Sequence, residues 1–290
     1  MLSRSIIFNH IFQNGLSPFC VSILNEKFFS VVEIWDTENL SIWKQLGELI
    51  PSMIIDVSLS PLMMEKSMSI IDTDESVRLY SLNHIFKRID FLSGIGIYDI
   101  SISSPENVVE NLRFQAIELL AAGLTKICAY ANSKGVQVSF EPFDRDFHKF
   151  RLVGTTDEFI KLANDVGRQC SNFSLTWDSA HVYLQDKKLL ESLKKAVNHI
   201  KRIHFANASI YKNNPYYGDC HIPFGEIGDI EIQDLKLLYQ IIMTKPNIKS
   251  VAFEIAVNEH IPQVNSPETA VSYIKELFCL LETSHEDFSP

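Results

Sequence analysis

The fold is decided by four short stretches in the second half of the chain: VQVSFE (136–141), FSLTWD (173–178), IKRIHFA (200–206) and SVAFEI (250–255). Each is rich in Val, Ile, Leu or Phe. Runs of this kind are typical of strands that a parallel sheet buries on both faces. Each stretch also carries an ionisable side chain at or near its end, where burial without a partner is costly.

Outward from these stretches, the first half of the chain holds four more runs of the same type, and helical patterns separate all eight. The runs are Ser5–Asn9, Val31–Trp35, Met53–Val57 and Ile97–Ile102. The clearest helical patterns cover Asn107–Ser133, 155–166 and the segment after Ser266, and weaker ones cover 17–29, 40–50, 75–93, 186–198 and 231–244. Thr155 followed three residues later by Glu158 is a helix-start signal.

The alternation of eight strands with helices favours one architecture. In 290 residues the repeat averages about 36, the size of a strand–helix unit. The pattern predicts an α/β fold: a (β/α)8 TIM barrel that forms a single domain over 1–290, with SHEDFSP (284–290) as a loose tail. The structural rival is a doubly wound open sheet, but the chain has no G-x-G-x-x-G turn.

Composition excludes several classes of protein. With 46% hydrophobic and 21% charged residues the chain is globular rather than disordered. The net charge of −10 has the wrong sign for a protein whose main partner is nucleic acid, and no apolar run approaches the roughly 18 residues of a membrane span. Five scattered cysteines without a C-x-x-C pair indicate reduced thiols and a cytoplasmic location.

In a barrel the carboxyl ends of the strands meet at one rim, where the chemistry of such folds is found. The last four predicted strands bring Glu141, Asp178, His204 and Glu254 to that rim. Three carboxylates that converge without a cation would repel one another and raise one another's pKa. Three oxygen ligands and one imidazole suit one divalent cation, Mn²⁺ or Mg²⁺ first, with Co²⁺ or Zn²⁺ possible.

More polar residues lie in the loops that follow these strands, and long loops of a barrel commonly carry function. The loop after 200–206 holds a D-x-H pair, and the loop after 136–141 holds several charged residues. Inside 31–35, Glu33 can reach the barrel interior. The candidates beyond the strands are His181, Asp219 and His221, with Arg145, Asn207 and His10 as candidate substrate-binding residues.

Five segments in this order resemble the xylose isomerase-like TIM-barrel superfamily, the sugar-phosphate isomerase/epimerase group. They are FEPFDRD (140–146), LTWDSAHV (175–182), IHFANA (203–208), YGDCHIPFGEIG (217–228) and VAFEIA (251–256). The resemblance implies that Glu141, Asp178, His204 and Glu254 hold a divalent metal. It also implies that His181 and the Asp219–His221 pair contact substrate or a second metal.

The sequence departs from two subgroups of that superfamily. Apurinic endonucleases add metal-binding histidines after strands three and four, where this chain has Ser58 and Ser103. Ketose 3-epimerases carry an Arg six residues after the histidine of strand seven, and position 210 here is Ile. The resemblance therefore implies neither a three-zinc nuclease site nor that mode of substrate binding.

The reaction expected from these residues is isomerisation or epimerisation of a small ketose, aldose or keto-polyol through a metal-bound enediolate. Glu141 and Glu254 are the candidate acid–base pair, with His181 or His221 as alternative bases. Three alternatives stay open: a lyase or dehydratase acting on a keto-inositol or keto-sugar, a DNA repair nuclease, and a non-catalytic sugar-binding barrel. The expected partner is a small carbohydrate, without membrane contact, and a homo-oligomer is possible.

Overall fold

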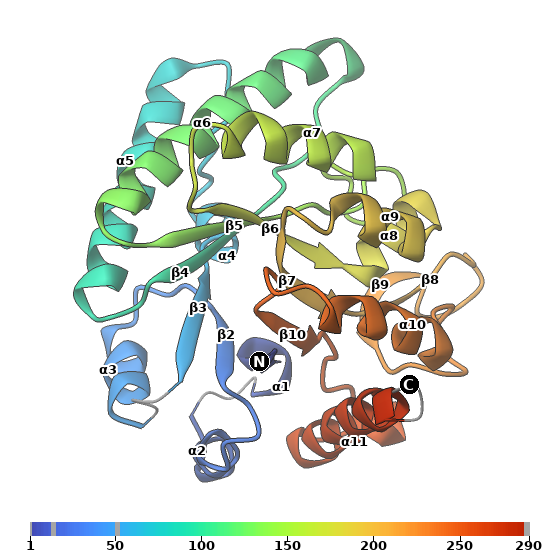
Figure 1. Cartoon of the computed structure of the whole chain (residues 1–290). Helices are drawn as coiled ribbons and strands as arrows, with labels where there is room; N and C mark the ends of the chain where they lie inside the picture. Colours follow the sequence, from blue (N-terminus) through green and yellow to red (C-terminus); the bar gives the residue numbers. More distant parts are fainter. Residues whose placement is uncertain (1, 13–15, 50–52, 287–290) are drawn as a thin grey trace.

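A computed structural model describes residues 2–12, 16–49 and 53–286 of the chain. Eight parallel strands close into a barrel in the order β1-β10-β7-β6-β5-β4-β3-β2, and the helices form a ring outside it (Figure 1). The barrel strands are β1 (Ser3–Ile7), β2 (Val31–Trp35), β3 (Ile54–Ser58), β4 (Asp99–Ser103), β5 (Gln137–Glu141), β6 (Phe173–Asp178), β7 (Ile200–Phe205) and β10 (Ser250–Phe253). The predicted (β/α)8 barrel is thereby confirmed.

The helices agree with most of the predicted patterns. They are α1 (Phe8–Ile11), α2 (Pro18–Asn25), α3 (Leu40–Leu49), α4 (Ser60–Glu65), α5 (Glu75–Gly94), α6 (Arg113–Ser133), α7 (Thr156–Gly167), α8 (Ser179–Asp186), α9 (Leu189–Ala196), α10 (Ile232–Met243) and α11 (Pro267–Glu286), with short 3₁₀ turns at Glu110–Leu112 and Pro262–Val264. Thr155 begins α7 with the expected capping box. Among the described residues, none of these helices is both long and apolar enough to cross a membrane.

The structure corrects three predicted boundaries. The pattern over 186–198 is the end of α8 followed by α9, separated at Lys187, whose φ of 56° ends α8. The loop after β7 is not structureless, because β8 (Asn207–Ser209) pairs with β9 (Gly218–Ile222) in an antiparallel hairpin. At the other end, α11 continues to Glu286 and so includes the start of the predicted tail, whose last residues, 287–290, lie outside the described residues.

The main core lies between the barrel and its helices. Strand side chains alternate in direction, so Trp177 points outward and its Nε1 donates to Ser192 Oγ on α9 at 3.1 Å. Its neighbour Asp178 points inward, toward the barrel axis. The barrel interior is unusually polar and includes buried Arg202, Asp56 and Glu33. Apolar packing therefore holds the helices on the barrel, and charge pairing fills its centre.

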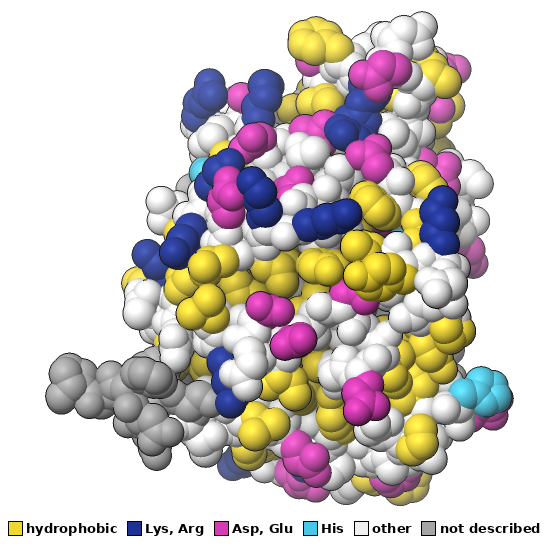
Figure 2. Space-filling model, turned by 90° about the vertical axis from the view of Figure 1, so that its right-hand side faces the viewer, with side chains coloured by type: hydrophobic (Ala, Val, Ile, Leu, Met, Phe, Trp, Pro, Cys, Tyr) yellow, Lys and Arg dark blue, Asp and Glu magenta, His cyan; other side chains and the backbone are white. Residues whose placement is uncertain are grey.

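One outer face of the molecule is visible in Figure 2. Basic side chains gather in its upper part with acidic side chains beside them, and a band of apolar side chains lies below them. This face therefore shows no continuous basic stripe of the kind that tracks a phosphate backbone.

Candidate functional site

Four side chains from successive strands converge at the rim of the barrel. Glu141 ends β5, Asp178 ends β6, His204 lies in β7, and Glu254 directly follows β10. One potential ligand atom from each lies within 4.8 Å of all the others. We call these four residues the rim cluster. Backbone register explains the convergence, since His204 is level with Asp178 on β6 and the Glu254 N–H donates to the Phe205 carbonyl at 2.9 Å.

The imidazole of His204 lies between carboxylates on both sides. Its Nδ1 is 3.1 Å from Glu141 Oε1 and 2.9 Å from Glu254 Oε2. Its Nε2 is 2.8 Å from Glu33 Oε2, and Ser5 Oγ donates to the other oxygen of Glu33 at 2.6 Å. If Glu33 accepts the Nε2 proton, Nδ1 is left with a lone pair directed at the rim cluster. That is how carboxylates commonly orient metal-binding histidines.

The residues of the rim cluster fit a divalent cation. Asp178 Oδ2 is buried and accepts no hydrogen bond among the described residues, an arrangement that is costly unless a cation satisfies the oxygen. Burial, together with the neighbouring carboxylates Glu254, Asp219 and Glu141, raises the pKa of Asp178 to about 7, although His181 opposes the shift. The mutual repulsion expected from the sequence is therefore present at Asp178, and a bound cation would remove it.

Glu254 responds in the opposite direction because histidines surround it. Burial favours its protonated form, but contacts with His10, His204 and His221 hold its pKa well below the usual range. Its Oε1 is 3.1 Å from His10 Nε2 and 3.0 Å from His221 Nε2, and the two rings lie 4.2 Å apart. His10, His221 and Glu254 also form a second set whose potential ligand atoms lie within 4.8 Å of one another.

A lysine that the sequence analysis did not single out lies next to Asp219. Lys149 Nζ lies 3.1 Å from Asp219 Oδ2, whose side chain is buried. His181 Nε2 is 3.9 Å from the same oxygen, and His181 Nδ1 is 3.7 Å from Asp144 Oδ2. We call Asp144, Lys149, His181 and Asp219 the lysine cluster. An ammonium group therefore lies at the carboxylate expected to bind substrate or a second metal.

The loop after β5 is held rigidly enough to place Lys149. Buried Asp144 accepts hydrogen bonds from the backbone N–H groups of residues 147–149. His148 Nδ1 accepts from the Asp219 N–H at 3.1 Å and so links this loop to β9. At Gly218 φ is 89°, and a Cβ there would come within 2.5 Å of the His148 ring, so glycine is required. The strained φ of 53° at His221 follows in the same hairpin.

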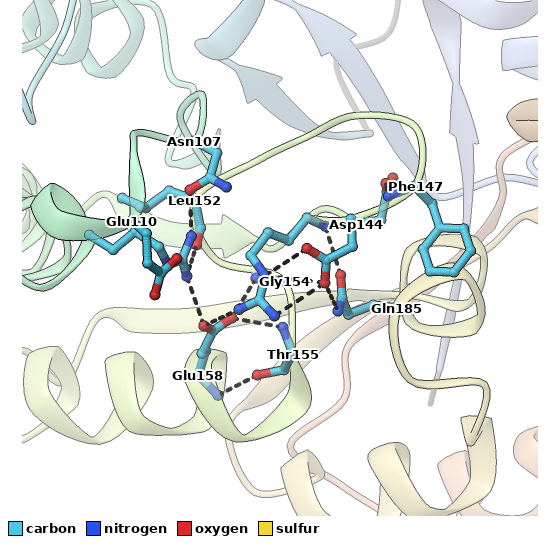
Figure 3. Close-up of polar contacts among 12 residues, drawn as sticks. Asn107, Glu110, Asp144, Phe147, Leu152, Gly154, Thr155, Glu158 and Gln185 are labelled. Atoms are coloured by element: carbon cyan, nitrogen blue, oxygen red, sulfur yellow. Dashed lines mark hydrogen bonds and ion pairs between the residues drawn. The ribbon is translucent and has the colours of Figure 1, made fainter.

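Two residues predicted to bind substrate have partners within the protein. Arg145 forms ion pairs with Asp146 at 3.1 Å and with Glu158 at 2.6 Å, and Figure 3 shows Glu158 joining this loop to α7. The side chain of Asn207 is buried and bonds the Pro223 carbonyl and the backbone N–H groups of Ala208 and Ile230. These contacts make Arg145 a loop anchor and Asn207 an anchor of the hairpin.

Arg202 lies beneath the rim cluster. After Lys149, it is the second positively charged residue that the sequence analysis missed. It forms an ion pair with Asp56 and donates to Ser139 Oγ at 3.0 Å. Burial raises the pKa of Asp56 to about 6, with Arg202 opposing the shift. The signal was present in the sequence: Arg202 and His204 are two residues apart in one strand, so both face the barrel interior. Lys149 had no such signal, because loop residues lack periodicity.

Comparison with known proteins finds relatives with a similar sequence and solved structures with the same fold. An inosose dehydratase of Clostridium perfringens is 28% identical over 127 residues, which are 40% of this chain and 40% of that protein. Solved structures with the same fold include a D-psicose 3-epimerase of Clostridium cellulolyticum H10 (TM-score 0.72, 12% identity, 97% of this chain and 99% of that one) and an IolI protein with a bound zinc atom (0.71, 15%, 97% and 98%). A 3-keto-D-glucoside 4-epimerase of E. coli also matches (0.69, 14%, 98% and 100%).

A family model described as "Xylose isomerase-like TIM barrel" matches residues 30–275, which include β2 to β10 and the whole rim cluster. This agrees with the resemblance in the five sequence segments and with the closed barrel. The chain belongs to the xylose isomerase-like TIM-barrel family.

Proposed function

We propose that the chain is a divalent-cation-dependent sugar isomerase or epimerase that acts on a small ketose, aldose or keto-polyol. The observation that carries the proposal is the rim cluster: two glutamates, an aspartate and a histidine whose ligand atoms lie within 4.8 Å of one another. The similarity of the chain's fold to that of sugar epimerases supports a carbohydrate substrate. Mn²⁺ and Mg²⁺ match the oxygen-rich donor set, and Zn²⁺ or Co²⁺ can also bind it.

When bound, the cation polarises the substrate carbonyl and acidifies the neighbouring C–H group. Glu141, at the end of β5, and Glu254, after β10, both contact His204 Nδ1, at 3.1 and 2.9 Å, so both can reach a substrate at the rim cluster. One carboxylate takes the carbon-bound proton, and the electron pair of the C–H bond moves toward the carbonyl oxygen to give an enediolate. Return of a proton to the other face of the same carbon gives an epimer, and return to the adjacent carbon gives an isomer.

The surrounding residues orient Glu254 and keep it ionised. His10 and His221 contact its Oε1, which leaves Oε2 turned toward the rim cluster. Lys149 supplies a fixed positive charge near Glu254, where it forms an ion pair with Asp219. That charge would stabilise an anionic enediolate without any rearrangement of the site. His181, placed between Asp144 and Asp219, and His221 remain alternative proton carriers.

A lyase is the second candidate, and the match to an inosose dehydratase favours it. The two reactions share the first proton transfer. In the lyase, a β-hydroxyl group then leaves with a proton as water, and the enol relaxes to a dehydrated ketone. Residues at the rim cluster would serve both reactions, so the product separates them.

The test combines metal analysis with isotope exchange. The purified chain, loaded with Mn²⁺, is incubated in deuterated water with a panel of ketoses, aldoses and inososes. The masses of the products are then measured by mass spectrometry. One bound cation per chain and a rearranged sugar that carries deuterium support an isomerase or epimerase. A product lighter by one water supports the lyase. If no substrate in the panel exchanges a proton while the cation is bound, the proposal is wrong.

A further inference from the structure

One cavity at the rim lies beside the rim cluster rather than within it. It has a volume of about 600 Å³ and lies among the loops that follow β3, β4 and β5. Much of its wall is apolar and contains Met63, Met68, Ile70, Val108 and Phe143. A cavity of this size and character is typical of a pocket that holds most of a small organic molecule.

The cavity begins close to the proposed site of reaction. Ser103 lines it and is paired directly with Glu141 across β4 and β5, whose backbones lie about 4.8 Å apart. Phe143 lines it too, and the Phe143 ring lies 4.2 Å from the ring of His181. A group attached to a sugar at the rim cluster would therefore reach the cavity by passing the ring of Phe143.

One partly buried cation faces this apolar space. The side chain of Arg151 is 14% exposed, and among the described residues its Nε has no hydrogen-bond partner and its closest carboxylate, Glu106, is 4.0 Å away and 84% exposed. Its Nη2 lies 3.9 Å from the sulfur of Met64. Arg145, six residues earlier in the same loop, has two close carboxylates. A partly buried guanidinium whose nearest carboxylate is distant and exposed is poorly compensated, and a ligand can supply a closer anion.

The walls around Arg151 are preformed. Glu106 and Arg151 form an antiparallel β-bridge, and the Leu152 N–H donates to the Pro105 carbonyl at 2.9 Å. The other acidic residue of the wall, Asp72, accepts the Asp74 N–H at 2.8 Å and makes no ion pair with Arg151 among the described residues. The cavity therefore combines a fixed apolar surface with one available positive charge.

We propose that this cavity binds the non-sugar part of the substrate, an apolar aryl or alkyl group that carries an anionic substituent paired with Arg151. The inference rests on the proposed function and narrows its substrate class from free sugars to sugar conjugates. The sugar would lie at the rim cluster, and the substituent would extend over Phe143 into the cavity.

Dye binding tests the cavity independently of turnover. Anilinonaphthalene sulfonate, an aromatic anion, is titrated into the full chain with and without cation, beside the uncharged phenylnaphthylamine. We expect Arg151→Met to weaken sulfonate binding at least tenfold and to leave the uncharged dye unaffected, and Arg151→Lys to restore part of the loss. Val108→Trp, which fills the cavity, should abolish binding of both dyes. The matched control is Arg168→Met, at a side chain that is 75% exposed.

Substrate conjugates then test the link to the rim cluster. Phenyl and carboxyphenyl keto-glucosides are compared with the free keto-sugar, and KM for the carboxyphenyl compound should be lowest, an advantage that Arg151→Met removes. Equal sulfonate affinity in wild type, Arg151→Met and Val108→Trp would overturn the inference. So would turnover of the free sugar with no preference for the conjugates, and in that case the proposed function survives. If no sugar reacts while dye binding still depends on Arg151, the proposed function fails and only the cavity's anion site remains.

Discussion

The rim cluster and the lysine cluster lie side by side at the same rim, and both gather buried acids around histidine, yet they balance charge differently. The rim cluster has three carboxylates and only an imidazole among its own members. The lysine cluster has its own ammonium group, Lys149, at 3.1 Å from Asp219. In the proposed function, the cation would bind at the rim cluster, whose own members include no ammonium group.

The largest effect is expected from Glu254→Gln, which removes a charge from the rim cluster. Because Glu254 is both a candidate ligand and a candidate base, proton exchange into substrate should fall by about a thousandfold or more. Deuterium incorporation measured by mass spectrometry checks this, with unfolding curves to establish that the fold is intact. Glu259→Gln, at a side chain that is 85% exposed, is the control and should match wild type. Full exchange activity in Glu254→Gln would remove that residue from the chemistry.

The second prediction sharpens the role of His204 in the rim cluster. Glu33→Gln keeps the shape of the partner of Nε2 but removes its charge, so the imidazole becomes a weaker ligand. We expect the affinity for Mn²⁺ to fall by about 10- to 100-fold, as measured by calorimetric titration. Glu38→Gln, at a side chain that is 53% exposed, should bind the metal like wild type. An unchanged dissociation constant in Glu33→Gln would show that Glu33 does not orient the ligand.

The third prediction concerns the ammonium of the lysine cluster. Lys149→Met removes the cation beside Asp219 and leaves that carboxylate near His181 and His221. We expect wild type to bind one Zn²⁺ per chain and Lys149→Met to bind a second, weaker one, as counted by elemental analysis after equilibrium dialysis. Lys188→Met, at a side chain that is 67% exposed, should stay at one. A single Zn²⁺ in Lys149→Met would mean that Lys149 does not exclude a second metal.

The smallest expected effect is on stability against pH in the metal-free protein. Burial lowers the pKa of His181, but Asp178, Asp144 and Asp219 outweigh it and raise the pKa to about 9. Because the folded pKa exceeds the unfolded one, this contribution is complete below about pH 6.5 and is lost as the pH rises through about 9. Urea unfolding across that window should show a shallower fall in the free energy of unfolding for His181→Asn than for wild type. His260→Asn, at a side chain that is 79% exposed, should keep the wild-type slope, and equal slopes in all three would contradict the assignment.

The strands and the rim cluster could be predicted because both follow from periodicity. Apolar runs mark the strands, and the parallel arrangement brings their carboxyl ends together, so residues as distant as Glu141 and Glu254 meet without any local signal between them. Glu33 could be expected inside the barrel for the same reason. The position of Lys149 could not be predicted from the sequence. It depends on the hydrogen bonds that Asp144 accepts within the loop and on the hairpin that carries Asp219. The sequence analysis singled out Arg145 in that loop, whereas the guanidinium that lines the cavity belongs to Arg151.

The closure of the barrel by β1 against β10, with Ser3 level with Ser250, has a consequence for synthesis. These two strands are the first and the last of the barrel to leave the ribosome. Until β10 emerges, β1 has a hydrogen-bonding edge without its neighbour, and His10, which follows β1, lacks Glu254. The rim cluster is therefore complete only after β10, the last strand of the barrel, has emerged from the ribosome.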